Sequence, residues 1–430
     1  MHTDVMGYDP LAERLTALRR ELHRYPEPAW YEYRTTCRVI RELQQQGIPV
    51  LYGRALHCPK AMYGLPDDHG EALQRAREEG CDEKLLAQLT GGYTGCVAVI
   101  RGDQPGKTVA VRVDLDCNRL AESGDEAHRP VREGFASHHE GCMHGCGHDG
   151  HTAIGVCLAE SLWARRGELR GQVKIIFQPA EEGAGGAASM TAAGVLDGVD
   201  IFLGMHIGLG LEPVGTIAAS AYGFLASTKM DVTFHGRGAH AGLCPEEGRN
   251  ALAAAATAVT NLLAISRSGQ GASRVNVGSL VSVAGRNVIP SEARMGVETR
   301  GETETINAYM ESSALRVCEA AAAMYGCTVE HRIMGRAGSA DCSSALAKRV
   351  CEFLGRQPGV IEVVPAFHFR ASEDVTTMMR RVQEQGGQAT ELMLGSAIAA
   401  PHHSERFDFD EAVMPLAVRT LTQLILTLVE

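Results

Sequence analysis

Soft metal-binding side chains crowd into one short stretch of the chain. Residues 141–151 read GCMHGCGHDGH, in which Cys146 and His148 flank a single glycine. Thiolate and imidazole are ligands that zinc and related divalent transition metals prefer. A structural cluster or a redox thiol is the alternative, but the residues downstream supply the rest of a metal site. The stretch therefore predicts metal binding, with Cys142 as a spectator.

A pair of carboxylates follows further along the chain. The segment IIFQPAEEG is an apolar run that ends in Glu181 and Glu182. Adjacent residues leaving a strand point in different directions, so one carboxylate can bind a metal while the other accepts a proton from water. A solvated acidic turn is the alternative. Pro179 and the glycines after the pair allow the chain to bend sharply there.

Histidines stand at two further places that a folded metal site could use. His206 lies near the end of the apolar run IFLGMHI, where a hydrogen-bonded core histidine is the alternative. His402 and His403 lie in a turn near the C-terminus, and we expect one of them to be a ligand and the other a bystander. Ligands scattered in this way along the chain are typical of a metal-assisted hydrolase.

Carboxylates are also expected to support the ligands from behind. Asp114 and Asp116 alternate at the end of the apolar segment VAVRVDLD, and Asp149 follows His148 directly. A carboxylate in such a place often orients a ligand without touching the metal. We expect this role for Asp114 and Asp149.

Strands that alternate with helices must position these residues. The pattern of leucines predicts helical structure over 9–46, and a helix is expected directly after the Cys/His stretch. Expected strands cover 96–102, 108–116, 172–182 and 199–207. This alternation predicts an α/β fold whose catalytic domain has a central mixed sheet flanked by helices.

A second domain is expected within the first. The chain of 430 residues is long for a single core. Residues 221–335 follow the order strand, helix, strand, strand, helix, strand, which is the ferredoxin-like order. We therefore expect an inserted domain at 221–335, between the two parts of the catalytic domain at 1–220 and 336–430.

Composition limits the kinds of molecule that the protein can bind and the cellular compartment in which it is expected. A net charge of −11 argues against nucleic acid and against anionic membrane surfaces. The N-terminal segment shows no secretory signal, and no apolar run is long enough to span a membrane. Thirteen cysteines without a short-range framework indicate reduced thiols. We expect a cytoplasmic enzyme that acts on a small molecule.

The motifs, taken in order, resemble a known family. They are VRVDLD, CMHGCGHDGHTA, FQPAEEG, GMHIG, FHGRGAHAG, GRNVIP and HHSERFDFDE. Together they resemble the metal-dependent aminoacylase and carboxypeptidase family, peptidase M20, and within it the amidohydrolase branch of hippurate and auxin-conjugate hydrolases. The likeness runs from about residue 10 to the C-terminus.

The resemblance implies a role for each candidate residue. It implies two divalent ions, manganese or zinc, with the ligands Cys146, His148, Glu182, His206 and His403. Glu181 would be the general base. His240, in the inserted domain, would reach the site across a dimer and help to bind the oxyanion. Asn287 and Arg336 would hold the substrate carboxylate, although a solvated loop arginine is the alternative for Arg336.

Two departures from the usual pattern narrow the resemblance further. The insertion at 51–94 and the sequence Asp-Cys-Asn-Arg at 116–119, in place of Asp-Ala-Leu-Pro, resemble the A-type subunits of hydrolases that cleave p-aminobenzoyl-glutamate, a folate breakdown product. This implies hydrolysis of that amide to p-aminobenzoate and glutamate. It also implies a homodimer formed through the inserted domain, a heterodimer with a homologous B subunit, or both.

Other functions stay open from the sequence. An N-acyl-amino-acid deacylase or a dipeptidase of other specificity is the alternative enzyme. A non-catalytic supporting subunit is the alternative from another class, and the completeness of the residue set favours the enzyme. The insertion at 51–94 is either a partner contact or a loop that controls substrate access.

Overall fold

The computed structural model describes residues 9–429 and divides into two compact units. The first unit comprises Met1–Tyr222, Ala340–Phe369 and Thr377–Glu430, and the second comprises Gly223–Ser339 and Arg370–Thr376. The second unit thus includes Arg370–Thr376, a short segment that the sequence pattern placed in the catalytic domain. Residues 1–8, part of the segment in which no secretory signal is expected, lie outside the described residues. Within the described part, no helix is both long and apolar enough for a membrane crossing.

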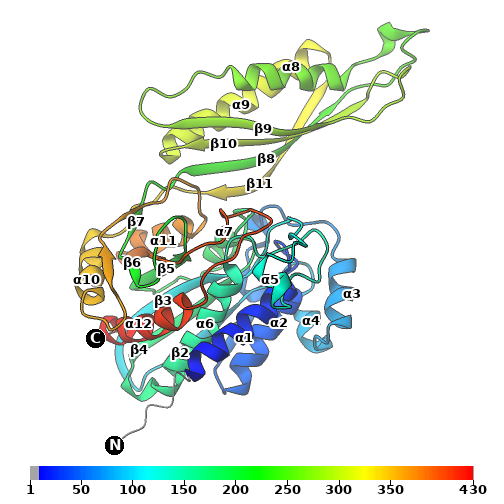
Figure 1. The fold of residues 1–430 in the computed structure, drawn as a ribbon. Helices are drawn as coiled ribbons and strands as arrows, with labels where there is room; N and C mark the ends of the chain where they lie inside the picture. The colour runs from blue at the N-terminus through cyan, green and yellow to red at the C-terminus, as the bar shows by residue number, and fades with distance from the viewer. Residues whose placement is uncertain (1–8, 430) are drawn as a thin grey trace, which may run out of the picture. The chain divides into compact units, whose positions relative to one another are not determined.

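An eight-stranded mixed sheet forms the centre of the first unit (Figure 1). In their order across the sheet, its strands are β1 (Val50–Tyr52), β2 (Cys96–Arg101), β4 (Arg170–Gln178), β3 (Gln104–Asp114), β5 (Ile201–Ile207), β14 (Gln388–Leu394), β6 (Thr216–Ala218) and β12 (Glu362–Val364). The four central strands β4, β3, β5 and β14 run parallel, whereas β2 and β6 pair antiparallel to their outer members. Parallel central strands end at one edge of the sheet, so residues after them can meet.

Helices cover this sheet, which confirms the expected mixed α/β architecture. The helices that lie wholly or mostly in the first unit are α1 (Pro10–Arg24), α2 (Tyr33–Gln45), α3 (Gly70–Glu78), α4 (Glu83–Leu89), α5 (Arg129–Arg132), α6 (His148–Ala164), α7 (Gly186–Ala192), α10 (Ser344–Leu354), α11 (Val375–Glu384) and α12 (Val413–Leu428). A small second sheet pairs β7 (Ala221–Tyr222) with β13 (Phe367–His368). Four strands of the large sheet had no counterpart among the expected strands, namely β1, β6, β12 and β14.

Helix α6 is the buried helix of the first unit. It contacts β3 on one side and α1 and α12 on the other, which explains why its sequence is apolar nearly all round. Gly155 permits this close approach, because a Cβ atom there would lie 2.7 Å from Cγ2 of Val113 and 2.9 Å from Cε1 of Phe177. The tight contact fixes the N-terminus of α6 over the ends of the central strands.

The insertion at 51–94 packs into the first unit. Its charged part forms two short helices, α3 and α4, and the chain turns between them at Gly80, which has φ of 85°. Cys81 and the helices pack against Tyr33 and Cys37 of α2. The Trp30 indole N–H donates to the carbonyl of Tyr63 at 2.7 Å. The insertion is therefore anchored to the segment between α1 and α2.

The second unit is built on a four-stranded antiparallel sheet. Its elements follow the order β8 (Ala226–His235), α8 (Ala251–Leu263), β9 (Ser273–Val281), β10 (Glu292–Gly301), α9 (Glu304–Met324) and β11 (Thr328–Ala337). The strands lie in the order β11, β8, β10, β9. Alternate residues of β10 are buried, including Ala293, Met295 and Val297, and they share one core with α8 and α9.

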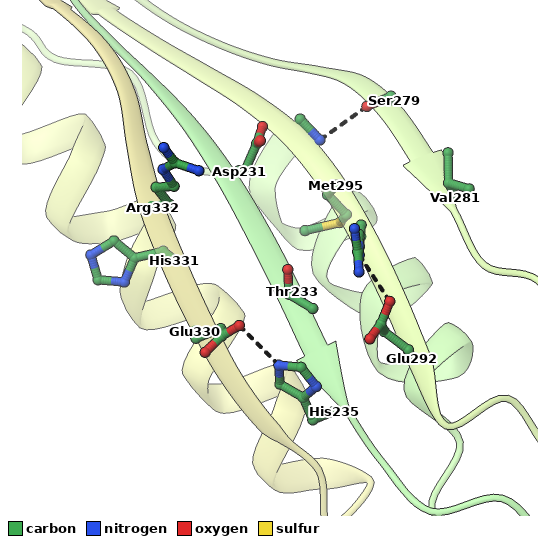
Figure 2. A pocket seen from close by; sticks show the side chains of 12 residues that line it. Asp231, Thr233, His235, Ser279, Val281, Glu292, Met295, Glu330, His331 and Arg332 are labelled. Carbon is green, nitrogen blue, oxygen red and sulfur yellow. Dashed lines mark hydrogen bonds and ion pairs between the residues drawn. The ribbon is translucent and has the colours of Figure 1, made fainter. Parts of the chain in front are cut away.

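A hollow of about 690 Å³ lies over this sheet and is lined mainly by polar side chains (Figure 2). Its charged groups pair with one another. His235 lies 3.1 Å from Glu330, and Arg294 lies 2.8 Å from Glu292. Exposed pairs of this kind contribute little to stability, and we interpret the hollow as the hydrated face of the sheet.

Candidate metal centre and active site

Helix α6 begins within the Cys/His stretch and positions two of the candidate ligands. Gly147 precedes the helix with φ of 91°, a left-handed value that glycine adopts without steric cost. Cys146 and His148, on either side of it, are both buried. The sulfur of Cys146 lies 3.5 Å from Nε2 of His206, near the end of β5. The helix start and the strand end thus bring three candidate ligands together.

The turn after β4 presents the two glutamates. Ala180 has φ of 55°, a value that alanine seldom adopts and that marks local strain. The Asp116 carboxylate accepts the backbone N–H of Glu181 at 2.8 Å and that of Glu182 at 3.0 Å. Both glutamates reach His148, whose Nε2 lies 3.8 Å from Oε2 of Glu181 and 3.9 Å from Oε1 of Glu182. Asp116 therefore fixes the turn that aims them.

The turn near the C-terminus separates its two histidines. Nε2 of His403 lies 3.3 Å from Oε2 of Glu182. Its backbone has φ of 62°, and its N–H donates to the carbonyl of Gly145 at 2.8 Å. His402 instead places Nε2 3.2 Å from the carbonyl oxygen of Ile207. The structure thus places His403, rather than His402, in contact with the glutamate.

Two groups of three potential ligands share Cys146. The ligand atoms of Cys146, His148 and His206 lie within 4.8 Å of one another, and so do those of Cys146, Glu182 and His403. Nε2 of His148 is buried and has no hydrogen-bond partner among the described residues. An orphaned buried imidazole nitrogen beside a thiol and carboxylates fits a divalent transition metal. The residues present therefore suit the implied ions.

Burial and neighbouring charges set the protonation of this cluster. Burial lowers the pKa of His206 well below its usual value, so its imidazole stays in the neutral form that binds metals. Burial also opposes the charged form of His148, yet the charge of Asp114 raises its pKa well above the usual value. Hydrogen bonds to Cys146 and Glu182 raise the pKa of His403 to about 10. Protons are held there by negative neighbours, and a bound cation would replace them.

Hydrogen bonds behind the ligands fix the orientation of the rings. Nδ1 of His148 donates to the backbone carbonyl of Asp116 at 2.8 Å, which turns Nε2 toward the glutamates. His151 accepts the N–H of Ile207 through Nε2 at 3.0 Å, so its Nδ1 carries the proton and donates to Asp114 at 2.7 Å. Asp114 also accepts from Arg112 at 2.6 Å. Asp114 thus lies behind the cluster, with Oδ1 3.7 Å from Nδ1 of the candidate ligand His148, on the side of the ring away from the glutamates.

Asp149 faces a different set of partners. Its carboxylate accepts from Nε of Arg19 at 2.8 Å and lies 2.7 Å from Nδ1 of His23. These contacts, within the described residues, tie the first turn of α6 to α1 rather than to a candidate ligand. Sequence reasoning missed Arg19 and His23, both fully buried. A signal existed, because they follow Leu15 by four and eight positions and so lie on the apolar stripe of α1.

The second unit holds the three remaining candidates. His240 is exposed, and its Nδ1 accepts the backbone N–H groups of Gly242 and Leu243, each at 3.1 Å. The carbonyl of Asn287 accepts the N–H of Ala241 at 2.9 Å, so the His240 and Asn287 segments lie side by side.

Arg336 lies on a separate strand of that unit and already has an acidic partner. Its two terminal nitrogens donate to the two oxygens of Glu311 at 2.7 and 2.8 Å. The Arg336 side chain is nevertheless 41% exposed. The Glu311 pair therefore fixes the orientation of Arg336 and leaves part of its surface open.

A cavity of about 410 Å³ lies beside the glutamate end of the cluster. Glu182 and His403 form part of its wall, and the rest comes from Pro28, Ala29, Cys117, Asn118, Arg119, Leu120 and Gly183. Apolar walls with a few polar groups are typical of a small-molecule site.

A match to a family model shows to which protein family this chain belongs. The model of peptidase family M20/M25/M40 matches residues 110–427. The chain belongs to this family. Membership confirms the resemblance seen in the motifs and the expectation of a metal-dependent hydrolase of amide or peptide bonds.

Two curated members of the M20 family match nearly the whole chain. Indole-3-acetyl-aspartic acid hydrolase of Enterobacter agglomerans is 49% identical over 414 residues, which cover 96% of this chain and 95% of that protein. The A-type subunit of the p-aminobenzoyl-glutamate hydrolase of Escherichia coli K12 is 45% identical over 416 residues, with the same coverage.

Solved structures show the same fold. The aminobenzoyl-glutamate utilization protein of Klebsiella pneumoniae has a TM-score of 0.83 at 41% identity and covers 97% of this chain and 96% of its own. A Bacillus subtilis M20 peptidase described as binding a dinuclear metal has a TM-score of 0.66 at 26% identity and covers 97% of this chain and 98% of its own.

Proposed function

We propose that this chain hydrolyses the amide bond between an aromatic acyl group and an acidic amino acid, with p-aminobenzoyl-glutamate as the first substrate to test. One observation carries the proposal. The five candidate ligands form two groups that share Cys146, and the proposed base Glu181 lies beside two of them, His148 and Glu182. Relatives at 45% and 41% identity bear the name of this substrate. The completeness of the set supports a catalytic rather than a supporting role.

The cofactor of this proposal is a pair of divalent ions, manganese or zinc. One ion would be held by Cys146, His148 and His206, and the other by Cys146, Glu182 and His403. A relative described as a dinuclear metal-binding peptidase supports this number. Divalent ions at such a site polarise a carbonyl group and make water more acidic.

The chain's own residues supply the proton transfers. Glu181 stands beside the proposed ligands, with Oε2 3.8 Å from Nε2 of His148. It accepts a proton as water adds to the amide carbon, and it returns that proton to the nitrogen as the C–N bond breaks. The products are a carboxylic acid and a free amino acid, so protons and atoms balance. His240 binds the developing oxyanion in this proposal, and Asn287 and Arg336 bind the substrate carboxylate.

A ferredoxin-like lid and an oligomer complete the proposal. The strand order of the second unit supports the ferredoxin-like assignment. We propose that this unit joins two chains, as a homodimer or with a homologous B subunit, since the name of the E. coli relative marks it as one of at least two different subunits. All thirteen cysteines, which lie within the described residues, are free, and this supports a cytoplasmic location.

Hydrolysis of indole-3-acetyl-aspartate is the second candidate. A relative that is 49% identical along nearly the whole chain bears that activity in its name. Both candidate substrates join an aromatic acyl group to an amino acid with two carboxylates. The two differ in the length of the acidic side chain and in the acyl ring.

A substrate panel tests the proposal. The full chain, loaded with zinc or with manganese, is assayed on p-aminobenzoyl-glutamate, indole-3-acetyl-aspartate, hippurate and a neutral dipeptide. Glu181→Gln serves as the matched control, and we expect it to retain metal while losing at least about 10²-fold in kcat. We expect kcat/KM for p-aminobenzoyl-glutamate to exceed that for hippurate by at least about tenfold. Wild-type rates no higher than those of Glu181→Gln on all four compounds would overturn the proposal.

A further inference from the structure

Arg119 stands in the wall of the cavity beside the metal cluster. It is the only arginine or lysine among the described residues that line this cavity, whose wall also carries the acidic Glu182. The side chain is exposed and follows the buried residues Asp116 and Cys117. A guanidinium group in this position faces the space that a substrate would fill.

The guanidinium has no carboxylate partner in the described part of the chain, although its charge helps to lower the pKa of the neighbouring Cys142 thiol. The guanidinium lies over the ring of Tyr31, with Cζ 5.6 Å from the ring centroid. Arg336, by contrast, has both terminal nitrogens bound to Glu311. Arginine carries five N–H donors in a fixed fork, and those of Arg119 remain available to a ligand.

The insertion at 51–94 fixes the ring on which Arg119 rests. The Tyr31 hydroxyl donates to the backbone carbonyl of Asp68 at 3.0 Å. Its ring meets that of His69 edge-on, with centroids 5.3 Å apart. A cation held against a fixed aromatic face keeps its planar fork pointing one way. The insertion thus supports the guanidinium from behind.

We propose that Arg119 binds the side-chain carboxylate of the acidic amino acid in the substrate. This inference rests on the proposed function, because a substrate with an aspartyl or glutamyl group carries two carboxylates. The second carboxylate loses hydration when it enters the cavity, and a hydrogen-bonded cation in the wall offsets that cost. Arginine binds carboxylates through two parallel hydrogen bonds, and such a bond to a charged group changes affinity by about 10- to 100-fold. Arg119 is therefore a specificity-determining residue.

A factorial experiment isolates this contact. The metal-loaded enzyme and its variants are assayed on p-aminobenzoyl-glutamate, p-aminobenzoyl-glutamine, acetylglutamate and acetylglutamine. Glutamine keeps the α-carboxylate and removes only the side-chain charge. We expect Arg119→Gln to raise KM about tenfold or more for both glutamate compounds, with kcat nearly unchanged, and to leave both glutamine compounds unaffected. Arg119→Lys should recover part of the loss as a point charge.

Arg54 offers a matched control. It is also exposed, and its Cζ also lies 5.6 Å from a tyrosine ring centroid, that of Tyr93, but it does not line the cavity. Arg54→Gln should therefore leave KM unchanged for all four compounds. Thermal unfolding of both variants shows whether the fold is intact.

Other outcomes contradict the proposal in recognisable ways. An effect of Arg119→Gln that follows the p-aminobenzoyl group, whether the amino acid is glutamate or glutamine, would show that Arg119 stacks on the acyl ring. An equal effect on all four compounds would also overturn it. If the wild type hydrolyses none of them, the proposed function fails. Calorimetric binding of p-aminobenzoyl-glutamate and p-aminobenzoyl-glutamine then decides on Arg119, because Arg119→Gln must abolish any preference for glutamate.

Discussion

The carboxylate of Asp116 accepts the backbone N–H of Glu181 at 2.8 Å. A buried acid after one strand therefore fixes the turn after the neighbouring strand, on which the proposed base stands. Asp116→Asn replaces one of the two acceptor oxygens with an NH2 group, which cannot accept a hydrogen bond. We expect kcat to fall by about 10- to 100-fold and the free energy of unfolding to fall by about 1–3 kcal/mol, measured by steady-state kinetics and denaturant titration.

An exposed aspartate provides the control for this substitution. Asp125 also accepts a backbone N–H through one oxygen, that of Ala127 at 2.8 Å, but it lies in an exposed turn. Asp125→Asn should change neither kcat nor the free energy of unfolding appreciably. A wild-type kcat in Asp116→Asn would show that the turn holds its shape without this acid.

Cys142 and Cys146 allow a test of which thiol binds metal. Cys142 is the more acidic thiol, whereas Cys146 is the candidate ligand. A hydrogen bond from Cys117 lowers the pKa of Cys142 to about 6, whereas burial raises that of Cys146. Geometry nevertheless selects Cys146, which belongs to both ligand groups. Cys146→Ser should lose most of both ions after dialysis, with a larger loss at lower pH because ligands must be deprotonated.

Elemental analysis of dialysed protein measures this difference. Cys142→Ser is the matched variant, since its thiol is also buried and lies on the same segment. It should retain a wild-type metal content. The reverse pattern, with metal lost from Cys142→Ser alone, would place the site elsewhere in the segment.

Subunit mixing tests whether His240 acts on another chain. Glu181→Gln and His240→Ala should each be nearly inactive. If His240 completes the site of a neighbouring chain, a mixed dimer contains one site with both residues intact, and mixing should restore up to about half of the activity per mixed dimer. Native mass spectrometry confirms that the chains exchange. Exchange without recovered activity would show that His240 serves its own chain or has no catalytic role.

His57 should make the protein less stable in mild acid. Its Nε2 donates to the carbonyl of Thr94 at 2.8 Å, its Nδ1 lies 3.1 Å from the Ser189 hydroxyl, and burial lowers its pKa to about 4. The unfolded chain has a histidine pKa of about 6.5 and binds the proton first. The stabilising effect is therefore complete above about pH 6.5 and is lost as the pH falls toward about 4, by at most about 3 kcal/mol.

Replacement by glutamine tests this origin of the acid sensitivity. His57→Gln keeps a donor but removes the titration, so its free energy of unfolding should fall less steeply between about pH 6.5 and about pH 4 than that of the wild type. His138→Gln, at a position that is not buried, is the control and should keep the wild-type slope. Parallel slopes in the wild type and His57→Gln would assign the acid sensitivity to other groups.

Local motifs were enough to predict much of the cluster. Cys146 and His148 flank one glycine, and Glu181 and Glu182 are adjacent, so their chemistry is visible in short segments. The choice between His402 and His403 depends on the backbone of a turn, which composition does not encode. The sequence also does not show which distant segments lie close together. The contact between Glu182 and His403, for example, depends on how the strands pair.

Other features could not be read from residue types alone. Arginine side chains are mostly exposed, so the residue type of Arg19 does not predict its full burial against Asp149 and Asp408, which only its spacing from Leu15 indicates. The pattern also missed β14, although this strand lies near the centre of the sheet and pairs with β5. Its sequence QATELML mixes polar residues with apolar ones. One of the polar residues, Thr390, is tolerated inside the fold because its hydroxyl donates to the carbonyl of Ala219. In such cases tertiary contacts override local preference.

Cys146 belongs to both candidate ligand groups, and the proposed metal site therefore has a consequence for folding. The groups draw on segments from Cys146 to His403, with the whole second unit lying between them in the chain. Loops of this length close slowly, and the unfolded chain contains no preformed cage for an ion. If the proposed site holds ions, we expect them to bind late in folding, after the central strands have paired. Newly made chains in a metal-poor cell would then fold without the added stability of bound ions, about 2.7 kcal/mol for each ion present at 100 times its dissociation constant. Metal supply would set the lifetime of this protein as well as its activity.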